Sequence, residues 1–142
     1  MVDGVLVTPL RIIDTLGGNV MHAMKQSDPG YVGFGEAYFS QVSYGAIKAW
    51  KRHREMTLNL SVPVGEVRFV LHDDREGLHL FQELTLSPSN YFRLTVPPMV
   101  WVGFQGLSPE GSIVLNVANL EHNPTEIDRQ EINQIDYNWE TA

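Results

Sequence analysis

The chain has 142 residues, of which 43% are hydrophobic and 19% are charged, so it can bury a core as one domain and does not have the composition of a disordered protein. It contains no cysteine, which excludes disulfide scaffolds, thiolate metal sites, iron–sulfur clusters and cysteine nucleophiles. The formal net charge of -7 argues against nucleic acid as the main partner.

The hydrophobic pattern repeats every second residue along most of the chain, which predicts β-strands. The clearest alternation lies in residues 56–62 (MTLNLSV), and turn sequences rich in Gly, Pro, Asp and Asn separate the apolar runs. About ten short strands at this spacing predict an all-β fold, an antiparallel sandwich or barrel. In chain order, strands are predicted within residues 5–12, 20–24, 37–42, 46–50, 56–62, 67–71, 78–86, 91–96, 100–104 and 113–117.

Helix signals are few. Residues 14–17 have the composition of a single turn, and Thr125 stands three residues before Asp128 in a capping-box pattern that predicts a helical segment over 125–131. No repeat, low-complexity stretch or linker is visible. We therefore expect one domain over residues 1–142, with an acidic, partly irregular tail from about residue 121.

The ends and the apolar runs also bear on location. No apolar run reaches the length of about 18 residues that a membrane helix requires. The first residues include Asp3 and Pro9, which is not the pattern of a signal peptide. We expect a cytoplasmic protein with no membrane partner.

The charges are unevenly distributed. From Glu121 onward there are six acidic residues and one basic residue, Arg129, so -5 of the formal charge lies in the tail. Four of the ten basic residues fall within residues 48–54, which also contain His53. A nearly neutral body with one basic cluster suits a small anionic ligand better than a polymer.

Five segments carry a pattern that extends over nearly the whole chain: residues 34–40 (FGEAYFS), 45–53 (GAIKAWKRH), 65–75 (GEVRFVLHDDR), 96–104 (VPPMVWVGF) and 135–139 (IDYNW). Together they resemble the dTDP-4-dehydrorhamnose 3,5-epimerase family, most closely its shorter related branch near the dTDP-sugar 3,4-ketoisomerases. The resemblance implies a cupin jelly roll, often a homodimer, that acts on a nucleotide-linked 4-keto-6-deoxy sugar without metal or organic cofactor. The implied chemistry is proton abstraction next to the ketone, in surface polysaccharide synthesis.

Several positions depart from the pattern of that family. Lys51 occupies the position of the first histidine in a His-x-His pair, which is the usual base, and His53 keeps the second. Val102 replaces a later histidine, and Leu16 stands where an arginine contacts the phosphates. Lys48 replaces another phosphate-binding arginine and keeps its charge without the bidentate geometry.

The same departures bear on metal binding. Cupin metal sites use the His-x-His pair, a following Glu and a later His, and here only His53 of that set is present. One histidine does not satisfy a zinc or iron ion that requires three protein ligands or more. We expect no metal.

The candidate site residues follow from these matches. Lys51 is a candidate base if burial and its basic neighbours lower its pKa, and the alternative is a charged lysine at the barrel mouth. His53 lies two residues further along the same strand and therefore on the same face. The other candidates are His122 as a proton donor, matched loosely to an acid tyrosine, and Lys48, Arg68 and Tyr38 as substrate-binding residues.

Three functions remain open at this level. The first is an epimerase or isomerase of a nucleotide-linked 4-keto sugar, with Lys51, His53 and His122 as catalytic groups. The second is a degenerate cupin that binds a sugar nucleotide or supports a partner enzyme without turnover. The third is a cupin for another small acidic ligand, because a fold alone does not fix a function.

Overall fold

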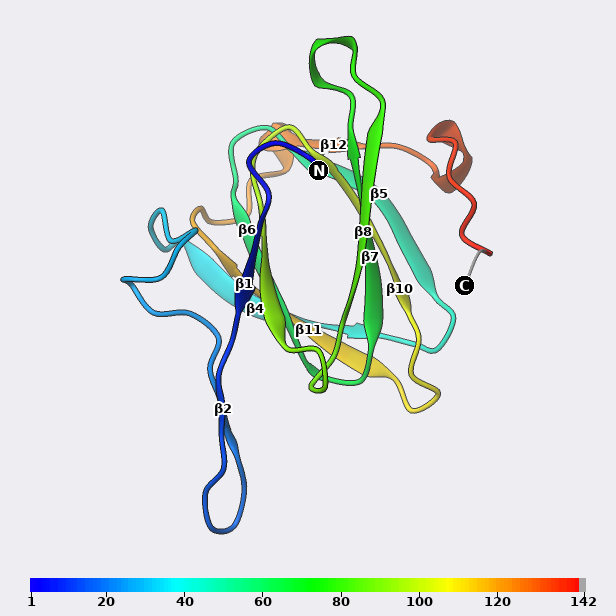
Figure 1. The fold of residues 1–142 in the computed structure, drawn as a ribbon. Coiled ribbons are helices and arrows are strands. Elements are labelled where there is room, and N and C mark those ends of the chain that lie inside the picture. Colours follow the sequence, from blue (N-terminus) through cyan, green and yellow to red (C-terminus); the bar gives the residue numbers. More distant parts are fainter. Residues whose placement is uncertain (141–142) are drawn as a thin grey trace.

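The computed structural model describes residues 1–140, whose strands form two five-stranded antiparallel sheets and a two-stranded hairpin (Figure 1). The first sheet has the order β1-β9-β6-β11-β4, and the second has the order β12-β5-β10-β7-β8. The sheets face each other around a common interior, so the predicted antiparallel jelly roll is confirmed. The strands are β1 (Leu6–Pro9), β2 (Ile12–Ile13), β3 (Val20–Met21), β4 (Glu36–Val42), β5 (Ile47–His53), β6 (Leu58–Val64), β7 (Val67–Asp73), β8 (Leu80–Leu86), β9 (Phe92–Val96), β10 (Trp101–Gly106), β11 (Ser112–Ala118) and β12 (Ile127–Arg129).

The interior is built from alternate residues of the central strands. Val62 on β6, Phe69 and Leu71 on β7 and Leu94 on β9 have 0% of their surface exposed. Because side chains of a strand point alternately to its two faces, the period of two in the sequence places these apolar groups between the sheets. Their burial removes apolar surface from water at about 25 cal/mol per Å², which is the main stabilising contribution to such a core.

A second apolar cluster lies on the outer face of the β12-β5-β10-β7-β8 sheet. Trp50, Val70 and Trp101 pack there against Ile135 and Trp139 of residues 132–140, which we call the C-terminal strap. The strap begins with the 3₁₀ helix η3 (Ile132–Gln134).

The close approach of the strap depends on a glycine of β10. A Cβ atom at Gly103 would lie 2.8 Å from Cζ2 of Trp139 and 2.9 Å from Cβ of Ala49. Only the missing side chain of Gly103 therefore allows the indole to lie against the sheet.

The predicted helical segment over 125–131 is wrong. Pro124–Glu126 forms the short 3₁₀ helix η2, in which the side chain of Asn123 accepts a hydrogen bond from the Thr125 amide. The following residues pair with the edge of β5 as strand β12, with Asp128 opposite Arg52. A free sheet edge thus overrides the local helix signal.

Several predicted strands have different bounds, and the predicted run 5–12 divides into β1 and β2. Within the predicted run 20–24, only Val20–Met21 forms a strand, whereas β5 continues past the predicted end at residue 50 to His53. The extension carries the whole basic segment into the second sheet. The remaining short 3₁₀ helix, η1 (Arg75–Gly77), lies between β7 and β8.

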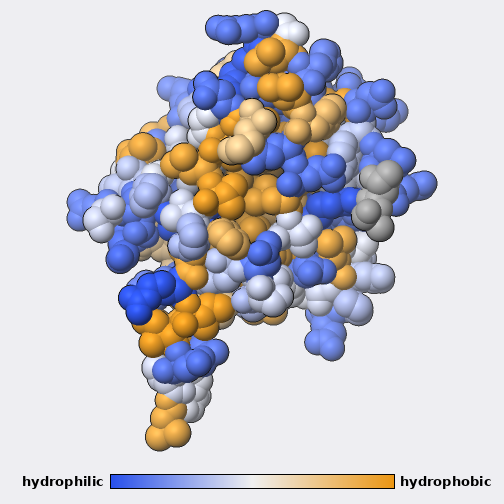
Figure 2. All heavy atoms as spheres, in the orientation of Figure 1, coloured by the Kyte–Doolittle hydropathy of each residue, from blue (hydrophilic) through white to orange (hydrophobic). Residues whose placement is uncertain are grey.

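The β2–β3 hairpin extends away from the body of the molecule (Figure 1). Its turn carries Leu16, whose side chain is fully exposed. The single helical turn predicted over residues 14–17 is wrong, because these residues form the hairpin connection between β2 and β3. In Figure 2 the end of this hairpin is apolar, and apolar side chains are also visible between the edge strands β1 and β8. Within residues 1–140, no helix has the length and hydrophobicity needed to cross a membrane.

Replacing Gly103 with Ala is expected to destabilise the protein by about 1–3 kcal/mol, because the added methyl group overpacks the contact with Trp139. Urea unfolding followed by tryptophan fluorescence measures the loss. In a Trp139→Ala background the same change should cost less, since the indole is gone. If Gly103→Ala lowers the free energy of unfolding equally in the natural protein and in Trp139→Ala, the packing of the strap does not depend on Gly103.

Candidate active site

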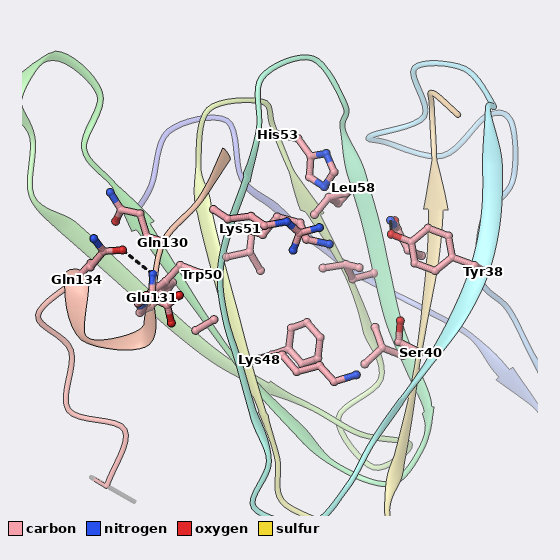
Figure 3. A pocket seen from close by; sticks show the side chains of 17 residues that line it. Tyr38, Ser40, Lys48, Trp50, Lys51, His53, Leu58, Gln130, Glu131 and Gln134 are labelled. Carbon is pink, nitrogen blue, oxygen red and sulfur yellow. Dashed lines mark hydrogen bonds between the residues drawn. The ribbon is translucent and has the colours of Figure 1, made fainter. Parts of the chain in front are cut away.

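A cavity of about 600 Å³ lies between the two sheets (Figure 3). Its walls come from β4, β5, β6, β10 and β11, and residues 129–131 and 134 complete its lining. Leu58, Leu60 and Val102 make part of the wall apolar, while other positions carry lysine, histidine, tyrosine and asparagine. This size and this mixture of surfaces are typical of a small-molecule site.

Strand β5 supplies the charged centre of the cavity. Lys51 and His53 alternate along the strand and point into the cavity (Figure 3). Arg52, between them, points to the opposite face, where its guanidinium contacts Asp128 at 2.7 Å and lies 4.6 Å from the centroid of the Trp101 ring. The alternation along the strand thus turns Lys51 and His53 into the cavity and Arg52 to the outer face of the sheet.

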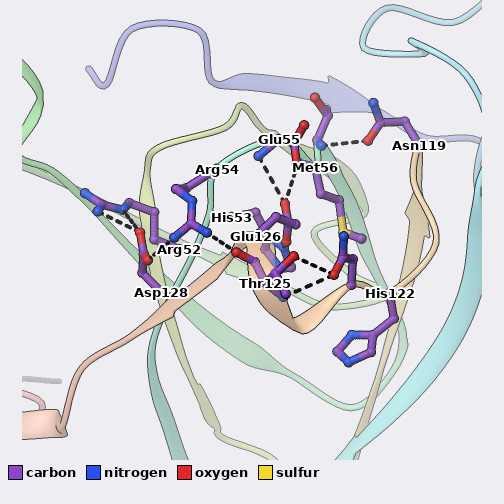
Figure 4. Close-up of polar contacts among 12 residues, drawn as sticks. Arg52, His53, Arg54, Glu55, Met56, Asn119, His122, Thr125, Glu126 and Asp128 are labelled. Carbon is purple, nitrogen blue, oxygen red and sulfur yellow. Dashed lines mark hydrogen bonds and ion pairs between the residues drawn. The ribbon is translucent and has the colours of Figure 1, made fainter.

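His53 forms a buried pair with Glu126. Its Nδ1 lies 2.5 Å from Oε2 of Glu126, and the exposed fractions of the two side chains are 6% and 4%. The other carboxylate oxygen of Glu126 accepts hydrogen bonds from the backbone amides of Glu55 at 3.0 Å and Met56 at 2.9 Å (Figure 4). Because Nδ1 faces the carboxylate, Nε2 is the nitrogen of His53 that is left for a ligand.

The arginines that follow Lys51 along β5 are neutralised outside the cavity. Asp128 accepts hydrogen bonds from Arg52 at both Nε and Nη2, and Arg54 also contacts this carboxylate (Figure 4). Asp74 lies 3.6 Å from Arg52 on the same side. These arginines therefore hold the β12 segment in place and do not face the cavity.

Three cationic side chains line the cavity itself. Lys48 and Lys51 come from β5, and Arg129 of β12 pairs in register with Lys51. Nζ of Lys48 donates to the backbone carbonyl of Gln41 at 2.9 Å. Among residues 1–140, none of the three forms a salt bridge. Against the one carboxylate of the lining, Glu131, these three cations make the cavity electropositive in a chain whose net charge is negative.

This environment shifts the ionisation of the central groups. Burial lowers the pKa of Lys51, and the charges of Arg129 and Lys48 lower it further, against a smaller opposing effect of Glu126. Burial also lowers the pKa of His53, although its hydrogen bond to Glu126 acts in the other direction. For Glu126, burial raises the pKa, but the hydrogen bonds from His53 and the two backbone amides outweigh it, so the net shift is downward. A neutral histidine beside an ionised carboxylate is thus favoured at neutral pH.

The comparisons with known proteins agree with this architecture. No protein-family model matches the chain. It is 26% identical to the spore coat polysaccharide biosynthesis protein SpsL of Bacillus subtilis, over 99% of this chain and 98% of that protein. It is 30% identical over 84 residues to the "probable low-salt glycan biosynthesis epimerase Agl13" of Haloferax volcanii, a match that covers 56% of this chain and only 54% of that protein.

A solved structure is more similar still. The dTDP sugar isomerase of Desulfovibrio desulfuricans G20 superposes with a TM-score of 0.92 at 36% identity, over 99% of this chain and 94% of that one. The chain belongs to the dTDP-4-dehydrorhamnose 3,5-epimerase-related family. Solved 3,5-epimerases and a sugar 3,4-ketoisomerase share the fold of this family member at 17–18% identity.

In this family member the structure brings four of the predicted site residues together. Lys48, Lys51, His53 and Tyr38 all line the cavity. Tyr38 stands on β4, on the opposite wall from His53 (Figure 3), and its hydroxyl oxygen accepts a hydrogen bond from Nδ2 of Asn116 at 3.1 Å.

The other two predicted residues lie elsewhere. His122 is exposed on the loop after β11 and is not part of the cavity lining, although its charge acts on the ionisation of His53. Arg68 is on the opposite face of the second sheet, where its guanidinium donates to Oε1 of Gln105 at 2.6 Å and to the carbonyl of Trp139 at 2.5 Å. The parity of Arg68 on β7 thus turns it toward the strap and out of the cavity lining, and its assignment to a phosphate stays a prediction.

Sequence reasoning missed Arg129, which lines the cavity, and Glu126, which is hydrogen-bonded to His53. Glu126 and Arg129 were counted only as charges of the tail, and they lie about 70 residues or more from their partners on β5. No local spacing links them to His53 or Lys51. The useful signal was the Asn-Pro-Thr-Glu sequence, whose Asn123 cap starts the turn that delivers Glu126.

The residues present were also tested as a metal site. Within the described part of the chain, no group of three or more His, Cys, Asp or Glu side chains is arranged to hold a metal ion. His53 is the only histidine of the cavity lining, and its Nδ1 is occupied by Glu126.

The lowered pKa of His53 predicts acid sensitivity. Its folded-state pKa lies below the ordinary value of 6.5, so the unfolded chain binds the proton more tightly and the free energy of unfolding falls as pH drops below 6.5. In urea unfolding between pH 7 and pH 5, His53→Gln should show a shallower decline than the natural protein. His22→Gln, a histidine outside the cavity, should keep the original slope. If the free energy of unfolding of His53→Gln falls with pH as steeply as that of the natural protein, the lowered pKa of His53 is not the cause of the acid sensitivity.

Proposed function

We propose that this protein is an epimerase or isomerase of a nucleotide-linked 4-keto-6-deoxy sugar in polysaccharide biosynthesis. The observation that carries the proposal is the buried His53–Glu126 pair at an electropositive cavity of sugar-nucleotide size. The relatives support it, since their names describe a dTDP sugar isomerase, a glycan biosynthesis epimerase and a polysaccharide biosynthesis protein. The reaction needs only proton transfer at a carbon next to the ketone, and side chains of this cavity can perform it.

His53 is the base in this mechanism. Glu126 accepts the hydrogen bond of Nδ1 and so fixes the tautomer in which Nε2 carries a lone pair. Burial keeps the imidazole neutral near pH 7, as a base must be before it takes a proton. The imidazolium that forms is then stabilised by the ionised carboxylate of Glu126.

The cations of the cavity hold the negative charges of the substrate. Lys51 shares the face of His53 and is suited to the ketone oxygen, where charge develops as the proton leaves. Lys48 and Arg129 are suited to the diphosphate, because both are cationic and neither has a carboxylate partner among residues 1–140.

Epimerisation also requires that a proton return to the opposite face of the sugar. Tyr38 is on the wall facing β5, and its hydroxyl is held by Asn116. We assign the return of the proton to Tyr38 in preference to the exposed His122. An isomerase would instead return the proton on the same side, and His53 itself could do so.

Solvent deuterium exchange tests the function. In heavy water with dTDP-4-keto-6-deoxyglucose or its GDP analogue, the C3 or C5 proton signal should disappear from the NMR spectrum. His53→Gln should slow this exchange about 100-fold or more, since a general base contributes at least that factor. Glu126→Gln should slow it as well, because Gln does not stabilise the imidazolium. His22→Gln, outside the cavity, is the matched control and should exchange at the original rate.

The alternative functions give different spectra. Broadening of the nucleotide signals without exchange would contradict the enzyme and support a binding protein that lacks turnover. If both nucleotides show no exchange and no broadening, the chain shares only its fold with this family and not the proposed activity. If His53→Gln still exchanges deuterium at the original rate, a residue other than His53 is the base.

We also propose that the protein is a cytoplasmic homodimer. Sugar nucleotides are made from intracellular nucleoside triphosphates, which supports the location. The dimer is supported by the β2–β3 hairpin, which extends from the body and exposes Leu16 and Val20 (Figures 1 and 2). Light scattering should give the mass of two chains, and Leu16→Asp should shift it toward one. Leu78→Asp, exposed on another loop, is the control, and a single-chain mass for the natural protein would refute the dimer.

A further inference from the structure

Lys51 is chemically different from the histidine that the family pattern has at its position. A histidine can only exchange protons with a ketone substrate, whereas a primary amine can also add to its carbonyl carbon. The chain contains three lysines, Lys25, Lys48 and Lys51, and two of them line the cavity. An amine in a cavity proposed to hold a ketone therefore offers a covalent route.

We propose that Lys51 forms an imine with the ketone of the sugar substrate, so that the α-proton is removed from an iminium ion and not from the free ketone. This inference rests on the proposed function, because it requires a keto sugar in the cavity. It assigns Lys51 a nucleophilic role and leaves the proton transfers to His53.

The steps balance without any further reactant. Nζ of Lys51, after passing its ammonium proton to Nε2 of His53, adds to the carbonyl carbon to give a carbinolamine. His53 returns that proton to the hydroxyl group, which leaves as water and gives the protonated imine. Nε2 of His53 then takes the α-proton, and the C–H electron pair moves toward the iminium nitrogen to form an enamine. A proton returns to carbon, one water molecule hydrolyses the iminium, and the ketone and the free amine are restored. No electrons are exchanged with a cofactor.

The position of Lys51 meets the first requirement, a neutral amine. Its ammonium forms no salt bridge within residues 1–140, and it stands between two other cations, Lys48 and Arg129. Burial and these two charges all lower the pKa of Lys51. Desolvation and a neighbouring cation are the two means by which proteins activate lysine as a nucleophile.

The surroundings meet the other requirements. Leu58, Leu60 and Val102 form an apolar wall of the same cavity, which limits the water available to hydrolyse the imine. His53, two residues along β5, is on the same face and can deliver and remove the protons that dehydration demands (Figure 3).

Lys48 is a poorer candidate for the same chemistry. Its side chain is exposed, and its Nζ donates to the carbonyl of Gln41. An amine that is already engaged by a backbone carbonyl and hydrated by solvent must lose both contacts before it can add to a ketone. The geometry therefore favours Lys51 over Lys48.

Reductive trapping tests the imine directly. The full-length protein is incubated with dTDP-4-keto-6-deoxyglucose or its GDP analogue and sodium cyanoborohydride, and its intact mass is measured. We expect one adduct per chain, with the mass of the sugar nucleotide less one water plus two hydrogens, and peptide mapping should place it on Lys51. Lys51→Arg, which keeps the charge but forms no imine, should lose the adduct. Lys25→Arg, an exposed lysine far from the cavity lining, should keep it.

Oxygen exchange provides a second readout. Each cycle of imine formation and hydrolysis replaces the ketone oxygen with one from solvent, so in ¹⁸O-water the natural protein should label the ketone at least tenfold faster than Lys51→Arg. Deuterium exchange without an adduct and without this labelling would overturn the imine and leave the proposed function intact. Absence of deuterium exchange, adduct and labelling with both nucleotides would overturn both. An adduct on Lys48 in place of Lys51 would overturn the assignment of the nucleophile.

Discussion

The hydrogen bond between His53 and Glu126 joins the two parts of the chain on which the site depends. His53 ends β5, and Glu126 ends the turn that precedes β12. Because the carboxylate also accepts hydrogen bonds from two backbone amides in the connection between β5 and β6, it ties three segments into one buried contact. Removing one member would leave buried polar groups unpaired, which proteins rarely tolerate. The same contact orients the base, so stability and proposed chemistry share one interaction.

The contact between His53 and Glu126 also positions the charged residues that follow Glu126 in the chain. Once Glu126 holds its turn, Asp128 pairs with the outward arginines of β5, and Arg129 is placed next to Lys51. The acidity of the tail is therefore partly a set of counter-charges for the basic segment and not only a solvated surface. Lys48, Lys51 and Arg129 outnumber the one carboxylate of the cavity lining, Glu131, so the cavity has a positive balance that suits an anionic substrate in an acidic protein.

The sequence predicted the parts of this structure that local patterns encode. The period of two predicted the strands of an antiparallel sandwich or barrel, and the resemblance to the epimerase family implied the jelly roll. The parity of Lys51 and His53 correctly put both side chains on one face of their strand. Arg68 lies outside the cavity, which the sequence could not show, since parity says that residues share a face but not which face is inside. Glu126 and Arg129 could not be found, because their partners are brought to them only by a pairing between the tail and β5. The helix expected at 125–131 was lost to the same long-range pairing.

The distance along the chain between His53 and Glu126 has a consequence for folding. Synthesis proceeds from the N-terminus, so every strand that forms the cavity walls, β4 to β11, is made before Glu126. Until then the imidazole of His53 faces a partly built barrel without its carboxylate. Closing a contact over so many residues is slow compared with forming the neighbouring hairpins. During synthesis, the strands of the cavity walls therefore precede the carboxylate that orients the proposed base.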